Sequence, residues 1–269
     1  MNTELKMKRC GIIITYRCNL KCKLCTAYSP YYKKPPHFSY ESLALSIDKY
    51  FSMVSFVDKF TVSGGEPLIH DEFEKIMKHL LEYSNQIGTI EIITNGTIVP
   101  KISFLKVING CEKISFLIDD YGDHLSTKIS SLEELFSKNR INYSVRNNNE
   151  INAHCNGWID FGDFTQKWFA QEDIDGIFNK CAIPQKMNFC FTIKNGEIHP
   201  CGPSYRCMEL GVIPKNENEF IDLLSENTTV NQKREKLIDI QKCSSLTACK
   251  FCNGMCEDSP RFPPAEQLD

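Results

Sequence analysis

The chain has 269 residues, a net charge of −3, and 42% hydrophobic and 24% charged residues. That length is enough for a full hydrophobic core, and the small net charge gives no overall attraction to nucleic acid, so we expect no nucleic-acid partner. No stretch approaches the roughly 20 apolar residues that cross a membrane, and fourteen cysteines in a chain of this size favour a cytoplasmic metal-binding protein over a small disulfide-bonded secreted one.

The first predicted element is a short, continuously apolar strand over residues 10–15, typical of a buried parallel sheet. Cys18, Cys22 and Cys25 follow it directly in the spacing C-x3-C-x2-C. Three thiolates from one loop can hold three irons of a 4Fe-4S cube, which leaves the fourth iron open to a small molecule. Zinc is the alternative, but a structural zinc site needs a fourth ligand, and this half of the chain supplies no paired cysteine knuckles.

A second motif follows the second predicted strand. An aromatic, basic and proline-rich loop over residues 28–37 is expected to lie over the site, and Ser39 is expected to cap the helix after it. The strand predicted over residues 56–62 then runs into Gly64, Gly65, Glu66 and Pro67. Glycines let the backbone approach a ligand closely, and Glu66 can orient the turn or accept a hydrogen bond.

The ordered pair of motifs resembles the radical S-adenosylmethionine (radical SAM) superfamily. The resemblance implies a 4Fe-4S cluster on Cys18, Cys22 and Cys25, with S-adenosylmethionine (SAM) on the open iron and its methionine amino group at residues 64–67. It also implies that the reduced cluster cleaves SAM into methionine and a 5′-deoxyadenosyl radical, which removes a hydrogen atom from the substrate.

Such a cluster must receive an electron, and basic residues surround the cysteine loop: Arg17, Lys21, Lys23, Lys33 and Lys34. They form either an ordinary solvated face or a docking patch for an acidic electron donor, flavodoxin or ferredoxin.

Strands and helices alternate beyond the second motif. A helix opening at Asp71 precedes strands predicted over 89–94, 113–118 and 141–145, with helices over 99–108 and 131–139 between them. This alternation predicts an α/β fold with a parallel sheet, and the resemblance makes it a partial (β/α)5-6 TIM-like barrel. A sixth strand could lie over 158–161. We place the barrel domain at 1–175 and a small cysteine-rich domain at 176–269.

Ligands of such folds lie at the C-terminal ends of the strands, and these ends are polar here. Thr94 and Asn95 resemble family residues near the ribose or the methionine carboxylate of the cofactor. Asp119, Asp120 and Arg146 are candidates to hold hydroxyls of cofactor or substrate, or to assist proton loss. Any of them could instead be an ordinary turn residue, because Asn and Asp favour turns.

Eight cysteines occupy the second domain: Cys181, Cys190, Cys201, Cys207, Cys243, Cys249, Cys252 and Cys256. Asn195-Gly196 predicts a two-residue hairpin before Cys201. The arrangement resembles the SPASM and twitch auxiliary-cluster domains of the superfamily. Its cysteine order favours one auxiliary 4Fe-4S cluster on Cys181, Cys201, Cys249 and Cys252, with Cys256, Cys243 and Cys190 in reserve; two clusters, or zinc at 243–256, stay open.

Four protein ligands would leave no open iron for a substrate, so we expect the auxiliary cluster to transfer electrons. If it takes an electron from the substrate, the product is oxidised; if Cys155 or Cys207 returns a hydrogen atom, the product is an epimer. In size and architecture the chain resembles aminocyclitol dehydrogenases, so we expect an oxidoreductase or epimerase acting on a sugar, cyclitol or other small polyol. A peptide- or protein-modifying radical SAM enzyme is the alternative, and an iron-sulfur or zinc-binding protein without enzymatic activity is the second.

Overall fold

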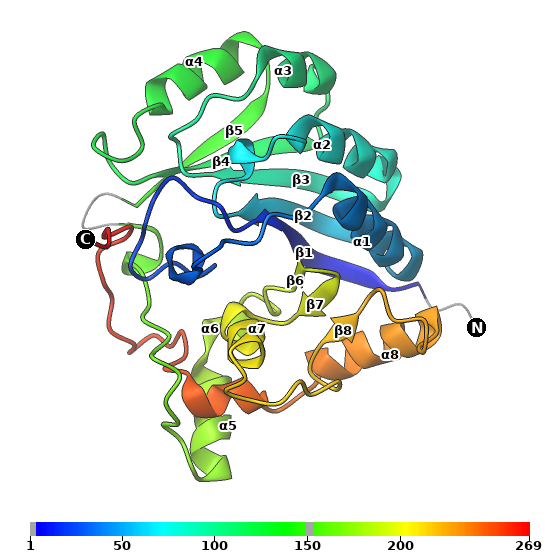
Figure 1. Ribbon diagram of the computed structural model, residues 1–269, viewed down its shortest axis with the longest axis vertical. Coiled ribbons are helices and arrows are strands. Elements are labelled where there is room, and N and C mark those ends of the chain that lie inside the picture. Colours follow the sequence, from blue (N-terminus) through cyan, green and yellow to red (C-terminus); the bar gives the residue numbers. More distant parts are fainter. Residues whose placement is uncertain (1–3, 149–152) are drawn as a thin grey trace.

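The computed structural model describes residues 4–148 and 153–269, which form a curved sheet with helices packed along its outer face (Figure 1). Eight strands lie in the order β5-β4-β3-β2-β1-β6-β7-β8. Neighbours among β1 to β6 pair in parallel, and β7 pairs antiparallel with both β6 and β8. The strands are β1 (Lys6–Thr15), β2 (Phe56–Gly64), β3 (Ile87–Thr94), β4 (Ile114–Asp120), β5 (Asn142–Asn147), β6 (Thr192–Lys194), β7 (Glu197–His199) and β8 (Ile221–Asp222). The predicted α/β fold, a partial TIM-like barrel, is confirmed.

Each of the first four strands is followed by a helix that packs on the sheet. The helices are α1 (Tyr40–Met53), α2 (Phe73–Glu82), α3 (Ile102–Ile108), α4 (Ile129–Lys138), α5 (Gln171–Lys180), α6 (Ala182–Gln185), α7 (Gly202–Glu209) and α8 (Val230–Gln241). Ser39 caps α1 as predicted, because its side chain accepts a hydrogen bond from the Ser42 N–H at 3.4 Å. Within the two described segments, no helix combines the length and apolar content needed to span a membrane.

The core lies between the sheet and these helices. The apolar face of α2 is buried there, including Ile76 and Leu80. It faces strand residues of the same core, among them Phe60, Ile90 and Phe116, which are fully buried. The opposite, concave side of the sheet is left to the loops that follow the strands (Figure 1).

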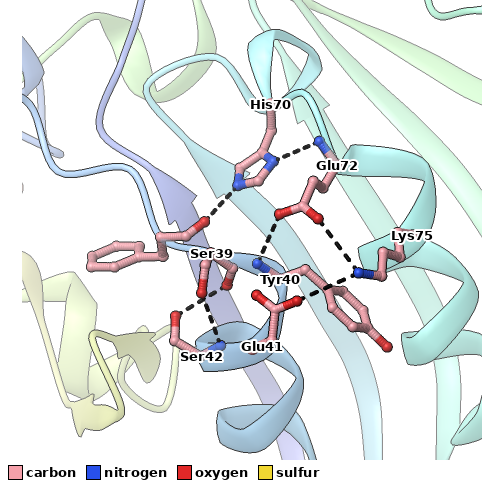
Figure 2. Close-up of polar contacts among 8 residues, drawn as sticks. Ser39, Tyr40, Glu41, Ser42, His70, Glu72 and Lys75 are labelled. Carbon is pink, nitrogen blue, oxygen red and sulfur yellow. Dashed lines mark hydrogen bonds and ion pairs between the residues drawn. The ribbon is translucent and has the colours of Figure 1, made fainter.

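Polar contacts fix the entry to α1 against the entry to α2 (Figure 2). Glu72 accepts a hydrogen bond from the Tyr40 N–H at 3.1 Å. Its own N–H donates to Nδ1 of His70 at 3.1 Å, so the His70 proton lies on Nε2, which donates to the Phe38 carbonyl at 2.8 Å. The segment after the Gly-Gly-Glu-Pro turn is therefore held against the segment that leads into α1.

The sixth parallel strand is not where the sequence suggested. Residues 158–161 form no strand; Trp158 makes an isolated bridge with Phe262. The sixth strand is β6, which pairs with β1 on one side and with β7 on the other. Its three residues are too short for a periodic signal, although the predicted Asn195-Gly196 turn after it is present with positive φ at both positions. Because β6 belongs to that hairpin, the sheet continues past residue 176, and the division of the chain there stays a prediction.

Candidate active site

The cysteine loop leaves the C-terminal end of β1 and closes on itself. The Cys25 N–H donates to the Cys22 carbonyl at 3.2 Å, and the Leu20 N–H donates to Cys18 Sγ at 3.4 Å. Burial is the main cause that raises the pKa of Cys18 to about 12 and that of Cys22 to about 11, and the neighbouring thiol of Cys25 contributes to both values. The backbone thus turns back on itself at these cysteines, and a metal bound here would replace the protons of the ligating thiols.

The Gly-Gly-Glu-Pro turn packs directly on this loop. The Gly65 N–H donates to the Thr15 carbonyl at 2.8 Å, and the Glu66 N–H donates to the Arg17 carbonyl at 2.9 Å. A Cβ added at Gly64 would overlap the Thr15 carbonyl oxygen, and one added at Gly65 would overlap that of Arg17. Only glycine fits at these two positions, so the two sequence motifs form one structural unit.

Glu66 joins the ends of β2 and β3. Its fully buried carboxylate accepts hydrogen bonds from the Leu68 N–H at 3.0 Å, the Thr94 hydroxyl at 3.0 Å and the Asn95 N–H at 2.8 Å. Burial raises its pKa to about 7, against the opposing effect of these hydrogen bonds. Pro67 then begins a short 3-10 turn, Pro67–Ile69.

The side chain of Asn95 reaches back from the end of β3 to the cysteine loop. Its Nδ2 donates to Asn19 Oδ1 at 3.0 Å and lies 3.7 Å from Cys18 Sγ. The Thr97 hydroxyl donates a hydrogen bond to Asn95 Oδ1 at 2.6 Å. The structure thus brings Glu66, Thr94 and Asn95 together beside Cys18.

Asp119 and Arg146 form an ion pair across the ends of β4 and β5. The Arg146 Nε lies 2.5 Å from Asp119 Oδ1 and its Nη2 lies 2.7 Å from Oδ2. Asn148 also donates to Asp119 Oδ1, at 2.9 Å. Asp120 is placed differently: its Oδ1 accepts the Gly122 N–H at 2.8 Å and so stabilises the local turn.

A cavity lies beside the cysteine loop, under the residues 28–37 that the sequence places over the site. Its volume is about 340 Å³, within the range of ligand pockets. The lining residues are Tyr16, Cys18, Leu20, Lys21, Ser29, Pro30, Tyr32, Pro35, Leu268 and Asp269.

The four predicted auxiliary ligands line one apolar cavity, which we call the four-cysteine cavity. Cys181, Cys201, Cys249 and Cys252 share it with apolar side chains that include Phe161, Ile183 and Phe189. Burial raises the pKa of Cys249 to about 12 and also raises that of the other three thiols. The reserve cysteines Cys190, Cys243 and Cys256 lie outside its lining.

This donor set fits a cluster. Among residues 4–148 and 153–269, no three His, Cys, Asp or Glu side chains converge closely enough to hold a single metal ion. Zinc needs thiolates that meet at about 2.3 Å from one point, whereas a cube takes one thiolate on each of four separate irons. The four thiols that line this apolar cavity are a donor set that a 4Fe-4S cube could use, one thiolate for each iron.

The two candidate hydrogen-atom donors differ in their surroundings. Cys155 is exposed, in the left-handed backbone region with φ 57°. Cys207 is fully buried in an apolar cluster with Met208, Ile213 and Phe220, and burial raises its pKa to about 11.

Sequence reasoning missed a cluster of polar side chains that joins the segment after the cysteine loop to α7, which we call the Lys194 cluster: Tyr16, Tyr28, Tyr32, Lys194, Tyr205, Arg206 and Glu209. Tyr16, Lys194 and Arg206 are buried, the other three tyrosines are half-buried, and Glu209 is exposed. Glu209 is its centre, accepting hydrogen bonds from Arg206 at 2.5 Å, Tyr32 at 2.6 Å and Tyr205 at 3.2 Å. The Tyr28 hydroxyl and Arg206 Nε are buried and have no hydrogen-bond partner among the described residues.

Lys194 itself is only 4% exposed, and its Nζ lies 4.6 Å from the centre of the Tyr205 ring. It makes no ion pair with any residue in the described part of the chain. Burial lowers its pKa to about 8, partly offset by Cys201, Glu209 and Cys25. The one sequence signal was a lysine that ends an apolar strand just before a hairpin turn.

Comparison with known proteins agrees with this geometry. The family model described as the Radical SAM superfamily matches residues 12–149. The GTP 3',8-cyclase of Aliarcobacter butzleri is 25% identical over 126 residues, covering 46% of this chain and 38% of the relative. The probable GTP 3',8-cyclase of Methanococcus aeolicus is 27% identical over 135 residues, covering 48% and 42%. The chain thus spans about two fifths of the length of these curated relatives.

Two solved structures share the fold over nearly the whole chain. Native anSMEcpe with bound AdoMet has a TM-score of 0.54 at 15% identity, covering 96% of this chain and 93% of that one. BtrN in complex with AdoMet and 2-DOIA has a TM-score of 0.52 at 12% identity, covering 97% and 99%. Such low identities show the fold alone. With the family model matching just over half of its length, this chain belongs to the radical SAM superfamily.

Proposed function

We propose that this radical SAM enzyme removes a hydrogen atom from a sugar, cyclitol or other small polyol and so oxidises or epimerises it. The Lys194 cluster supports this proposal most directly. It offers buried cationic donors in Lys194 and Arg206, an acceptor in the exposed Glu209, and buried unpartnered polar atoms on Tyr28 and Arg206. Buried polar groups without partners are costly, so they indicate a hydroxyl-rich ligand that completes their hydrogen bonds.

Family membership implies SAM and a 4Fe-4S cluster, and the residues present fit both. Cys18, Cys22 and Cys25 would hold the cluster; the residues proposed for SAM are Gly64, Gly65, Glu66, Pro67, Thr94 and Asn95. When bound and reduced, the cluster supplies the electron that cleaves SAM to the 5′-deoxyadenosyl radical. We further propose one auxiliary 4Fe-4S cluster, in the four-cysteine cavity of a SPASM- or twitch-like domain.

The chain's own residues would then bind and orient the substrate. Arg146, held in place by Asp119, is proposed to bind hydroxyls at the strand ends, while Asp120 serves mainly its own turn. Oxidation of an alcohol also needs a group that takes up its proton, and Asp119 is proposed to assist. Cys155 and Cys207 are the two candidate hydrogen-atom donors for epimerisation, and Cys207 directly follows Arg206 of the Lys194 cluster in α7.

An electron donor, flavodoxin or ferredoxin, is proposed to dock beside the cysteine loop. Arg17, Lys21, Lys33 and Lys34 are exposed there and make no ion pair with a described residue. Lys23 differs because it pairs with Glu266 at 3.3 Å. A cytoplasmic location stays a prediction.

Similarity in fold to BtrN in complex with AdoMet and 2-DOIA supports a small-molecule substrate. In size and architecture the chain resembles 2-deoxy-scyllo-inosamine dehydrogenase, which supports a polyol. The second candidate is a peptide substrate, because native anSMEcpe with bound AdoMet and the Cp18Cys peptide has the same fold, with a TM-score of 0.53.

The substrate class can be tested by isotope transfer. The reconstituted, reduced enzyme is incubated with SAM and a panel of deuterated sugars, cyclitols and peptides, and deuterium in 5′-deoxyadenosine is measured by mass spectrometry. We expect transfer from at least one polyol and from no peptide. Transfer from peptides alone would contradict the proposal.

A further inference from the structure

Residues 265–269 run antiparallel to the cysteine loop, although they are far from it in sequence. The Lys23 N–H donates to the Glu266 carbonyl at 2.7 Å, and the Leu268 N–H donates to the Lys21 carbonyl at 2.8 Å. These bonds place Gln267 directly opposite Cys22, with which it forms an isolated bridge. We call residues 265–269 the strap.

The side chain of Gln267 spans two neighbouring groups of the loop. Its Oε1 accepts the Lys21 N–H at 2.7 Å, and its Nε2 lies 3.3 Å from Cys22 Sγ. Nε2 also donates to the Ala265 carbonyl at 2.6 Å. The reverse amide orientation would set the NH2 group against the Lys21 N–H, so the network fixes the donor toward the sulfur.

A donor aimed at a cluster ligand has a specific physical effect. Reduction adds a negative charge that is shared with the cysteine sulfurs, and a hydrogen bond to sulfur stabilises that charge. Hydrogen bonds to the sulfurs are among the factors that set the potentials of iron-sulfur clusters. Cys22 is buried, so water has little access to replace the amide.

We propose that Gln267 is a positioning residue that raises the reduction potential of the cluster on Cys18, Cys22 and Cys25 by donating to Cys22 Sγ. The inference rests on the proposed cluster ligands and not on the proposed substrate. Gln267 would then help this cluster to accept its electron, a role that neither cysteine motif indicates.

The test is a redox titration of the reconstituted full chain in the absence of substrate. Electron paramagnetic resonance measures the reduced cluster at each potential. The signal of this cluster is identified by its response to SAM in a parallel sample. For Gln267→Met, which keeps the side-chain length and removes the donor, we expect about a tenfold lower ratio of reduced to oxidised cluster at a fixed solution potential, or 59 mV for one electron. Gln267→Leu should behave in the same way.

Glu266→Gln is the matched control, because it removes the ion pair with Lys23 and leaves the Gln267 amide in place. Its titration should match that of the unmodified protein. An unchanged potential in both Gln267 variants, at full iron content, would overturn the proposal. So would failure of both to load the cluster while Glu266→Gln loads normally, since the strap would then serve assembly. Absence of a SAM-responsive signal in the unmodified protein would instead refute the cluster assignment itself.

Discussion

Gly65 packs against the carbonyl oxygen of Arg17, with no room between them for a side chain. A Cβ at Gly65 would also lie 2.9 Å from the Cβ of Cys18, so any larger residue must push the cysteine loop away from the turn. This contact joins the two motifs from which the chemistry was predicted.

We expect Gly65→Ala to displace the loop and to lower the iron content of the reconstituted protein by about four atoms, one cluster. Gly176→Ala is the control, because a Cβ at this position of α5 meets nothing within 4 Å. It should keep full iron content and stabilise the protein by about 0.5–1 kcal/mol, the helix preference of alanine over glycine. Equal iron content in both variants would mean that the Gly65 contact does not position the cysteines.

We expect the buried charge of Lys194 to lower the free energy of unfolding. Burial lowers its pKa from 10.5 to about 8, so the folded protein holds this proton less tightly than the unfolded chain does. Below pH 8 the charged amine is present in both states, and the folded state carries the full cost of burying it. That cost declines as pH rises from 8 to 10.5, where the amine becomes neutral in both states.

We therefore expect Lys194→Met to raise the free energy of unfolding at pH 7 by about 2–3 kcal/mol, and by progressively less above pH 8, in urea titrations. Turnover of the variant should fall, because a buried charge that destabilises the protein indicates a functional role. Lys233→Met is the contrast, because the buried Lys233 donates to the carbonyls of Leu223 and Ser225 at 2.8 Å each. That variant should be destabilised; if Lys194→Met is destabilised equally, Lys194 is an ordinary structural lysine.

Iron analysis can decide the auxiliary site. With one auxiliary cluster, the reconstituted protein should hold about eight irons, at four per cube. Cys249→Ser and Cys252→Ser should each reduce the count to about four, whereas Cys243→Ser and Cys256→Ser should leave it unchanged, because they lie outside the four-cysteine cavity. About twelve irons in the unmodified protein would contradict a single auxiliary cluster.

The docking patch can be tested without disturbing the strap. Lys33→Glu combined with Lys34→Glu reverses two exposed charges beside the cysteine loop, whereas reversal of Lys23 would also break its pair with Glu266. We expect turnover driven by reduced flavodoxin to fall several-fold, and more at low salt, because long-range attraction is screened by ions. Turnover with dithionite should not change; equal losses with both reductants would rule out a docking role.

The sequence predicted the first half of the fold well, because its strands and helices are long enough to show their periods and Cys18, Cys22 and Cys25 have a diagnostic spacing. The placement of Glu66, Thr94 and Asn95 beside Cys18 followed from the rule that strand ends of a parallel sheet converge.

Features built from long-range contacts were missed. β6 has only three residues, and its place beside β1 depends on a pairing that no local pattern encodes. Lys194, Arg206 and Glu209 look like ordinary polar residues until the fold brings them together and buries the first two. Gln267 has no local signal at all, because its partner Cys22 is distant in sequence.

Cleavage of SAM is the most direct test of the central claim, that Cys18, Cys22 and Cys25 hold a cluster that performs radical SAM chemistry. The protein is reconstituted anaerobically, reduced with dithionite and given SAM, and 5′-deoxyadenosine is quantified by chromatography. We predict its formation by the unmodified protein and none by Cys22→Ala. Undiminished formation by Cys22→Ala, or no formation by a fully iron-loaded unmodified protein, would contradict the account.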